Sequence, residues 1–200
     1  MKKILINFAH PAKSHSKINN TLLKAVEDLD NVTINDLYSQ YPDFIIDVER
    51  EQHLCETHDI IIFQHPFYWY SNPSIMNEWM ELVLKQNWAY GAYNNALKEK
   101  YWMQAISTGA ENRTYQKKGS VGYTIDEFLT PFRATANLCQ MINLPPFMVM
   151  GANGGLSYED INDYAKDYRR VLIALRDETI DFKKITALKF MNDILNILKK

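Results

Sequence analysis

The segment that follows the apolar run at residues 3–8 carries residue types that could bind an anion. Ser16 and Asn19 supply polar side chains, and Lys17 adds a full positive charge. A helix that begins here would add unpaired N–H groups and the positive end of its dipole. The loop lacks the Gly-Lys-Ser/Thr and Gly-x-Gly-x-x-Gly patterns of common nucleotide-binding loops. We therefore expect a phosphate monoester here; the simpler alternative is that Ser14 or Ser16 only caps the helix.

A run of four aromatic residues follows the third apolar segment. The run consists of Phe67, Tyr68, Trp69 and Tyr70. Four consecutive aromatic side chains in a loop cannot all be buried, and exposed apolar patches often mark binding surfaces. Flat rings suit a planar ligand such as an isoalloxazine ring. A hydrophobic corner packed on the next helix, or a contact between two copies, remains the alternative.

A third loop contains small residues directly after the fourth apolar segment. Its members are Ser107, Thr108, Gly109 and Ala110. Small side chains let a backbone approach a ligand closely, so its N–H groups can donate to ring carbonyls. Taken alone the pattern is weak, because small residues also end ordinary strands.

Alternating strand and helix patterns must position these loops. Short apolar runs predict strands at residues 3–8, 32–35, 59–64, 100–107 and 146–151. Helical spacing predicts helices at 18–29, 47–57, 73–86, 125–142, with a break or new start at Pro131, and 158–176. This alternation predicts an α/β fold: a flavodoxin-like, doubly wound, five-stranded parallel sheet of order 2-1-3-4-5 with helices on both faces. The three loops would then meet at the carboxyl edge of the sheet, where such folds bind ligands.

Composition narrows the class of protein further. The chain has 200 residues, 46% hydrophobic residues and a net charge of -2, which is typical of a globular domain and gives no attraction to nucleic acid. No stretch approaches the roughly 20 apolar residues of a membrane span. Cys55 and Cys139 fit no metal spacing and are expected to be buried free thiols. We predict a cytoplasmic protein without a metal site, with His53 and His58 in solvent and His65 bonded to backbone.

Several separated motifs resemble one family of flavoproteins. They are Ala9-His10-Pro11, Tyr41-Pro42-Asp43-Phe44, Gln64-His65-Pro66, Trp69-Tyr70-Ser71, Trp88-Ala89-Tyr90-Gly91 and Leu144-Pro145-Pro146-Phe147. In this order the chain resembles the flavodoxin-like NAD(P)H:quinone oxidoreductases, in particular the ancillary flavoproteins of glutathione-gated potassium efflux systems. The resemblance covers residues 3–176. One departure is that Gly109 is followed by Ala110, where family members often continue with glycine.

The resemblance implies a cofactor and the residues that hold it. The cofactor would be FMN, with FAD as the alternative. Its phosphate and ribityl chain would be held by His10, Ser16, Lys17, Ile18 and Asn19. Its ring would be flanked by Phe67, Tyr68, Trp69 and Tyr70, and its edge contacted by Ser107, Thr108, Gly109 and Ala110.

The resemblance also implies an activity and partners. NAD(P)H would deliver two electrons in a ping-pong cycle to a quinone-like acceptor, and the protein would be a homodimer. By their loop positions, Tyr115 and Tyr123 after the fourth strand and Tyr90 and Tyr93 before it could donate a proton to the acceptor. Of these we select Tyr115 and Tyr90. The alternative function is a regulatory, redox-sensing flavoprotein bound to a membrane transporter such as a potassium efflux system.

The C-terminal residues form a segment of their own. We divide the chain into a flavin-binding domain at residues 1–178 and an extension at 179–200. Apolar and lysine residues alternate with helical spacing between Asp181 and Lys200, which predicts a basic amphipathic helix. We expect it to pack on its own domain or across a homodimer. A peripheral position at the inner face of the membrane, or docking on a partner, is the alternative.

Overall fold

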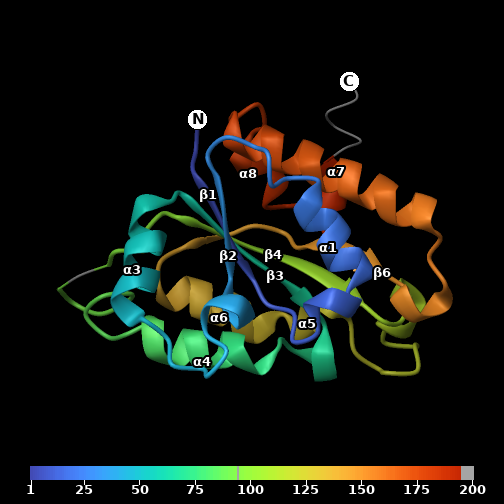
Figure 1. The fold of residues 1–200 in the computed structure, drawn as a ribbon, viewed down its shortest axis with the longest axis horizontal. Coiled ribbons are helices and arrows are strands. Elements are labelled where there is room, and N and C mark those ends of the chain that lie inside the picture. Colours follow the sequence, from blue (N-terminus) through green and yellow to red (C-terminus); the bar gives the residue numbers. More distant parts are fainter. Residues whose placement is uncertain (94, 195–200) are drawn as a thin grey trace.

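A parallel β-sheet runs through the middle of the protein (Figure 1). The computed structural model describes residues 1–93 and 95–194. Its strands are β1 (Ile4–Phe8), β2 (Val32–Asp36), β3 (Ile60–Pro66), β4 (Tyr101–Thr108), β5 (Ile142–Asn143) and β6 (Phe147–Met150). The order is β2-β1-β3-β4-β5, with β6 also paired to β4, so the predicted fold class and strand order are confirmed.

The fifth position of the sheet is shared by two short strands. β5 pairs with the start of β4, and β6 pairs with its end. Pro145 and Pro146 lie between them, and proline has no N–H to donate to a ladder. The helix predicted to reach Ile142 therefore ends earlier, because Ile142 belongs to β5.

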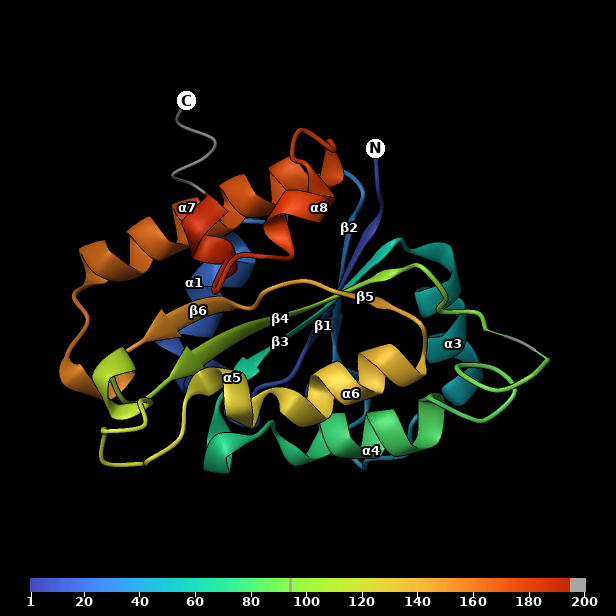
Figure 2. The same cartoon turned by 180° about the vertical axis from the view of Figure 1, so that it is seen from behind.

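Helices cover both faces of the sheet (Figures 1 and 2). They are α1 (Lys17–Lys24), α2 (Leu37–Gln40), α3 (Val48–Thr57), α4 (Ser74–Val83), α5 (Ile125–Phe128), α6 (Thr130–Leu138), α7 (Tyr158–Arg176) and α8 (Phe182–Ile185). α1 and α7 lie on one face, while α3, α4 and α6 lie on the other. Pro131 stands in the first turn of α6, so the predicted new start is confirmed.

Side chains along each strand point alternately to the two faces of the sheet, and they pack under the helices on both faces. In β1, Ile4, Ile6 and Phe8 join the core under α1 and α7, whereas Leu5 points to the layer under α3 and α4. All these side chains are fully buried. A strand covered on both faces requires a near-continuous apolar run, and this pattern predicts the strand from the sequence.

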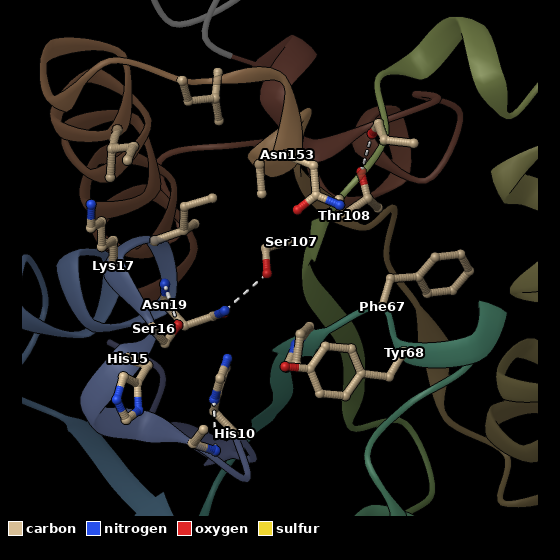
Figure 3. Close-up of a pocket in the computed structure, with 18 of the residues that line it drawn as sticks. His10, His15, Ser16, Lys17, Asn19, Phe67, Tyr68, Ser107, Thr108 and Asn153 are labelled. Atoms are coloured by element: carbon tan, nitrogen blue, oxygen red, sulfur yellow. Dashed lines mark hydrogen bonds between the residues drawn. The ribbon is translucent and has the colours of Figure 1, made fainter.

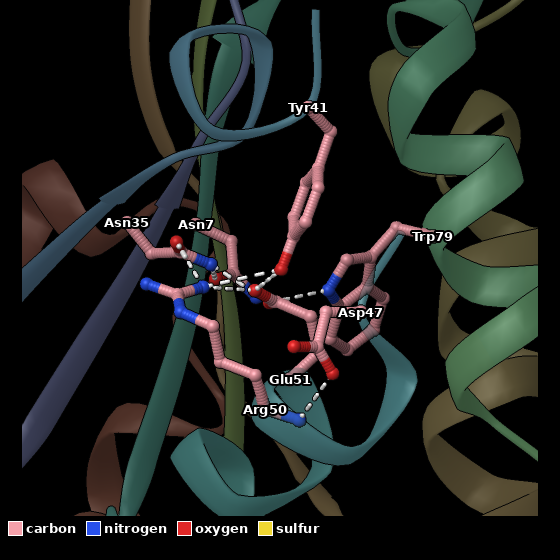
Figure 4. Close-up of polar contacts among 7 residues, drawn as sticks. All are labelled: Asn7, Asn35, Tyr41, Asp47, Arg50, Glu51 and Trp79. Carbon is pink, nitrogen blue, oxygen red and sulfur yellow. Dashed lines mark hydrogen bonds and ion pairs between the residues drawn. The ribbon is translucent and has the colours of Figure 1, made fainter. Parts of the chain in front are cut away.

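A buried carboxylate joins α3 to the sheet (Figure 4). Glu51 is fully buried on a helix whose sequence looks polar. One carboxylate oxygen accepts hydrogen bonds from Asn35 Nδ2 and Trp79 Nε1, both at 2.7 Å. The other accepts from the Tyr41 hydroxyl at 2.7 Å and pairs with Arg50. The cluster thus connects β2, α3, α4 and the loop after α2 through one side chain.

The predictions for His65 and for both cysteines are confirmed, and the prediction for His58 is wrong. His65 is buried, and its ring bonds to the Pro66 carbonyl and to Gln104, as expected for a structural residue. His58 is not in solvent as predicted: it is buried, with Nδ1 2.7 Å from the Leu54 carbonyl oxygen and Nε2 2.8 Å from Thr33 Oγ1. It caps the end of α3, where free carbonyl groups need donors. Cys55 and Cys139 are free and buried, as predicted.

The extension does not form the predicted single helix within the described residues. α8 is one turn long, and a second short helical turn spans Met191–Ile194. Ile185, Met191 and Ile194 are all buried in the core beneath α7, a set of contacts that the bent path makes possible. The remainder of the predicted helix, residues 195–200, lies outside the described residues. In the part of the chain that the structure describes, no helix has the length and apolar character to cross a membrane.

Candidate functional site

A cavity of about 830 Å³ opens at the carboxyl ends of β1, β3, β4 and β6 (Figure 3). All thirteen residues predicted to hold a cofactor line it. They are His10, Ser16, Lys17, Ile18, Asn19, Phe67, Tyr68, Trp69, Tyr70, Ser107, Thr108, Gly109 and Ala110. The three loops that the sequence singled out therefore converge, because the carboxyl ends of neighbouring parallel strands share one edge.

The start of α1 forms the polar end of the cavity. Ser16 caps the helix by accepting a hydrogen bond from the Asn19 N–H, at 3.3 Å. Lys17 is exposed at the first helical position and makes no ion pair within residues 1–93 and 95–194. The helix dipole and this ammonium group place positive charge at the same end of the cavity. The capping alternative is thus correct for Ser16, and it leaves the anion-binding character of the helix start intact.

Asn19 connects two of the loops. Its Nδ2 donates to Ser107 Oγ at 2.9 Å, so the two side chains meet at the cavity wall in Figure 3. Its backbone carbonyl accepts from Gln64 Nε2 at 3.0 Å. The side-chain oxygen Oδ1 is buried and has no hydrogen-bond partner in the structure. A buried acceptor without a partner is costly, which suits a site that receives a donor such as a hydroxyl group from a ligand.

His10 presents a neutral ring to the cavity. Its Nδ1 accepts a hydrogen bond from the Ala12 N–H at 3.1 Å. Burial is the largest cause that lowers its pKa below the usual value. The proton of the neutral ring therefore resides on Nε2, which can donate to a ligand. The ring also lies edge-on to Tyr68, with centroids 6.0 Å apart.

The aromatic side chains of residues 67–70 differ in burial. Phe67 is buried against Tyr115 and Phe128, so for this residue the hydrophobic-corner alternative holds. Trp69 is 93% exposed, and Tyr68 and Tyr70 are about half exposed. Trp69 and Tyr70 adopt left-handed backbone conformations, with φ of 51° and 63°. Such conformations are costly for non-glycine residues and often occur at ligand sites.

A fourth loop, which the sequence analysis did not single out, completes the cavity. Asn153 follows β6 and lines the cavity opposite His10 (Figure 3). Its N–H donates to the Gly109 carbonyl at 2.8 Å. A Cβ atom on Gly109 would lie 2.6 Å from Asn153 Nδ2, so the two loops touch because Gly109 lacks a side chain. The signal in the sequence was available: Gly151, Gly154 and Gly155 mark a tight loop at the end of the fifth strand position.

The two candidate tyrosines lie in different places. Tyr115 lines the cavity and is buried. Tyr90 does not reach it; this residue lines a separate hollow of about 280 Å³ with Met80, Leu84 and Leu138. The reason is topological. α4 leads away from the carboxyl edge, so the loop between α4 and β4 must lie at the amino edge, where β4 begins.

Comparisons with known proteins agree with this geometry. The family described as having a flavodoxin-like fold matches residues 2–172. The glutathione-regulated potassium-efflux system ancillary protein KefG of Pectobacterium atrosepticum is 45% identical over 150 residues, which cover 75% of this chain and 82% of KefG.

Two solved structures are also similar. General stress protein 14 from Treponema denticola, crystallised in complex with FMN, is 37% identical with a TM-score of 0.82, covering 86% of this chain and 99% of that one. An NADPH-quinone reductase from P. pentosaceus is 31% identical with a TM-score of 0.77, covering 84% of this chain and 96% of that one. With the strand order, the converging loops and these matches, the chain belongs to the flavodoxin-like family.

Proposed function

We propose that this protein binds FMN in the cavity and acts as an NAD(P)H:quinone oxidoreductase. One observation carries the proposal: a single cavity joins a positively charged helix start to half-exposed flat rings. A phosphate monoester at one end and a planar ring at the other would satisfy both features. The FMN complex of the Treponema protein and the name of the relative from P. pentosaceus, NADPH-quinone reductase, support the assignment.

The α1 end of the cavity would hold the phosphate and the ribityl chain. The first N–H groups of α1, Ser16 and Lys17 would bind the phosphate, and Asn19 Oδ1 would accept a bond from a ribityl hydroxyl. Ile18 and His10 line the same end, where His10 Nε2 would donate a further hydrogen bond. This arrangement uses the buried Asn19 Oδ1, which has no hydrogen-bond partner among residues 1–93 and 95–194.

The opposite end would hold the ring. Tyr68 and Trp69 would cover one face, and the backbone of Thr108–Ala110 would donate to the ring carbonyls. The bound flavin would supply the hydride chemistry of the reaction. Tyr115 would hold a proton at its hydroxyl group and deliver it to the acceptor oxygen. Its burial raises its pKa, so it keeps that proton at neutral pH.

The first experiment identifies the cofactor. The protein should be purified, its visible spectrum recorded and the released flavin identified by mass; we expect FMN, whereas FAD would correct the assignment. Oxidation of NADPH and NADH is then followed with and without a benzoquinone. A protein that stays colourless after reconstitution with either flavin would contradict the proposal.

A matched pair of variants tests the phosphate site. Lys17→Ala removes the charge at the start of α1, whereas Lys24→Ala removes an exposed lysine from the last turn of the same helix. We expect Lys17→Ala to weaken FMN binding about tenfold, since charge-assisted hydrogen bonds contribute about 1.5–3 kcal/mol. Lys24→Ala should bind FMN as the unmodified protein does.

A regulatory role is the second candidate, and the similarity to KefG is what favours it. In this role the protein would bind the cytoplasmic side of a membrane transporter and respond to the redox state of its flavin, with little turnover. Steady-state reduction of a benzoquinone discriminates between the two functions. Robust turnover favours the enzyme, and bound flavin with negligible turnover favours the sensor.

We also propose a homodimer that uses the face containing α4 and α6. This face carries the hollow at Tyr90, and Leu138 beside it is 57% exposed. An exposed leucine next to an apolar hollow suits contact with a second copy. Analytical ultracentrifugation of the protein and of Leu138→Asp should show a dimer that the substitution weakens.

A further inference from the structure

The outer edge of β6 is bonded to the C-terminal extension instead of to another strand. The Asn192 side chain makes two hydrogen bonds to one residue: its Oδ1 accepts from the Met148 N–H at 2.9 Å, and its Nδ2 donates to the Met148 carbonyl at 3.0 Å. One residue before Asn192, the Met191 N–H donates to the carbonyl of Pro146, two residues before Met148, at 2.9 Å. The backbone groups that face away from β4 at Pro146 and Met148 are therefore bonded.

The amide of Asn192 imitates the backbone of a neighbouring strand. A side-chain amide has a donor and an acceptor in one plane, as a peptide group has. In a sheet, an edge residue such as Met148 offers one N–H and one C=O to the next strand. Proline at position 146 offers only a carbonyl, and this carbonyl has its own donor.

Apolar contacts hold the extension on both sides of this edge. Met191 and Ile194 are fully buried in the layer beneath α7. Phe190 packs on the opposite side, against the cluster that includes Ile125, Phe132 and Met148. The segment thus crosses the sheet edge from one layer to the other, between α7 and β6 in Figure 2.

This edge contact lies outside the part of the chain shared with the family. The family match ends at residue 172, and the Treponema structure is covered over 99% of its length by 86% of this chain. The extension that carries Asn192 therefore lies beyond the family match, and it adds buried side chains and an edge contact to the core of this chain.

We propose that the extension closes the outer edge of β6 against pairing with a strand from a second copy of this chain. An open edge strand is a template for such pairing, and proteins commonly cover it. The Asn192 amide occupies the hydrogen-bonding positions that an added strand would use. This inference concerns the sheet edge and does not depend on the proposed activity.

Hydrogen exchange of the flavin-free, full-length protein tests the closure directly. Asn192→Leu removes both hydrogen bonds with little change in side-chain volume. Asn192→Asp keeps an acceptor for the Met148 N–H but loses the donor. We expect the Met148 N–H to exchange about tenfold faster in Asn192→Leu, with a smaller increase in Asn192→Asp. Lys184→Ala, an exposed residue of the same extension, is the matched control and should leave the exchange rate unchanged.

Sedimentation velocity over a range of protein concentrations tests the partner. With the edge open, Asn192→Leu should form species larger than those of the unmodified protein, and Lys184→Ala should not. Unchanged protection of the Met148 N–H in both Asn192 variants would overturn the proposal. Faster exchange without any increase in association would overturn it as well. If Asn192→Leu does not fold, the comparison of Asn192→Asp with Lys184→Ala decides by the same two measurements.

Discussion

Asn19 in α1, Ser107 at the end of β4 and Asn153 after β6 are short polar side chains from three separate segments, and all three line one cavity. Asn19 bonds to Ser107, and Asn153 lies against Gly109. Two side-chain amide nitrogens thus set the spacing between these segments. Asn19 Nδ2 bonds to Ser107, and Asn153 Nδ2 occupies the space that a side chain at position 109 would fill. Such contacts fix the geometry of a site before a ligand enters, which reduces the entropic cost of binding.

Gly109 and Asn153 can be tested as a pair. Gly109→Ala places a Cβ atom where Asn153 Nδ2 lies, so Asn153 must move. We expect flavin to bind about three- to tenfold more weakly, with a small change in stability, because the contacting atom is the end of a flexible side chain. Combining Gly109→Ala with Asn153→Ala should remove the clash. Equal effects of Gly109→Ala in both backgrounds, measured by flavin titration, would contradict this coupling.

Tyr115 is the residue on which the proposed proton transfer depends. Tyr115→Phe should lower kcat for quinone reduction by about 100-fold or more while leaving the bound flavin content unchanged. Burial raises the pKa of Tyr115, outweighing the hydrogen bonds to Thr108 and Ala110 that lower it. Its hydroxyl group therefore stays protonated, and kcat should be flat from about pH 6 to about pH 9. Tyr123→Phe, which alters an exposed tyrosine, is the control; equal losses in both variants would remove Tyr115 from this role.

At the scale of elements, α3 shows why a sequence pattern can mislead. Its residues are mostly polar, yet Glu51 and Cys55 are buried. Hydrophobic spacing cannot reveal a carboxylate whose four partners come from Asn35, Tyr41, Arg50 and Trp79. The bonds to Asn35, Tyr41 and Trp79 join segments that are 10 to 28 residues away from Glu51 in the chain.

The contribution of this cluster can be measured with a matched pair on the same helix. Glu51→Gln removes the charge that pairs with Arg50 and sets an NH₂ group against one of the donors. We expect the free energy of unfolding to fall by about 2–4 kcal/mol, because partners are left buried and unpaired. Glu49→Gln alters an exposed residue and should change it by less than about 0.5 kcal/mol. Urea denaturation gives both values, and similar losses would show that the cluster contributes little.

The strands and the first three loops could be predicted because their signals are local. β1 and β3 contain short apolar runs, at residues 4–6 and 60–63, and the loops after them contain residue types with few other uses. Tyr90 lies away from the cavity because the loop between α4 and β4 is at the amino edge of the sheet, a position that only the order of strands and helices reveals. Asn153 was missed because its glycine neighbours indicate only a tight loop; its place in the cavity depends on contact with Gly109, 44 residues earlier in the chain. The path of the extension depends on the edge of β6, which no periodicity in its own sequence encodes.

For the molecule as a whole, three buried histidines connect stability to pH. Burial is the largest cause that lowers the pKa values of His10, His58 and His65 in the folded protein. The unfolded chain, with histidine near 6.5, therefore binds more protons than the folded protein once the pH falls to about that value. This contribution to stability is fully present above pH 6.5 and is lost as the pH falls toward the lowered values.

We therefore expect the urea midpoint to decrease steadily below about pH 6.5. His58→Gln should reduce the slope, since it removes one of the three groups, and His53→Gln, which changes an exposed histidine, should not. The comparison is made by denaturation at several pH values. If the urea midpoint depends on pH equally in both variants, protonation of His58 does not change the free energy of unfolding.

The backbone of the aromatic loop has a consequence for how a ligand enters. Trp69 and Tyr70 hold positive φ angles although neither is glycine, and each such residue costs about 1–3 kcal/mol. Trp69 gains little packing in return, since it is 93% exposed. Relaxation of these two residues toward ordinary angles would swing the indole away and widen the entrance. Binding of a planar ligand would then be coupled to the return of Trp69 and Tyr70 to positive φ angles. The association rate constant of the ligand should therefore be limited by this backbone rearrangement and not by diffusion.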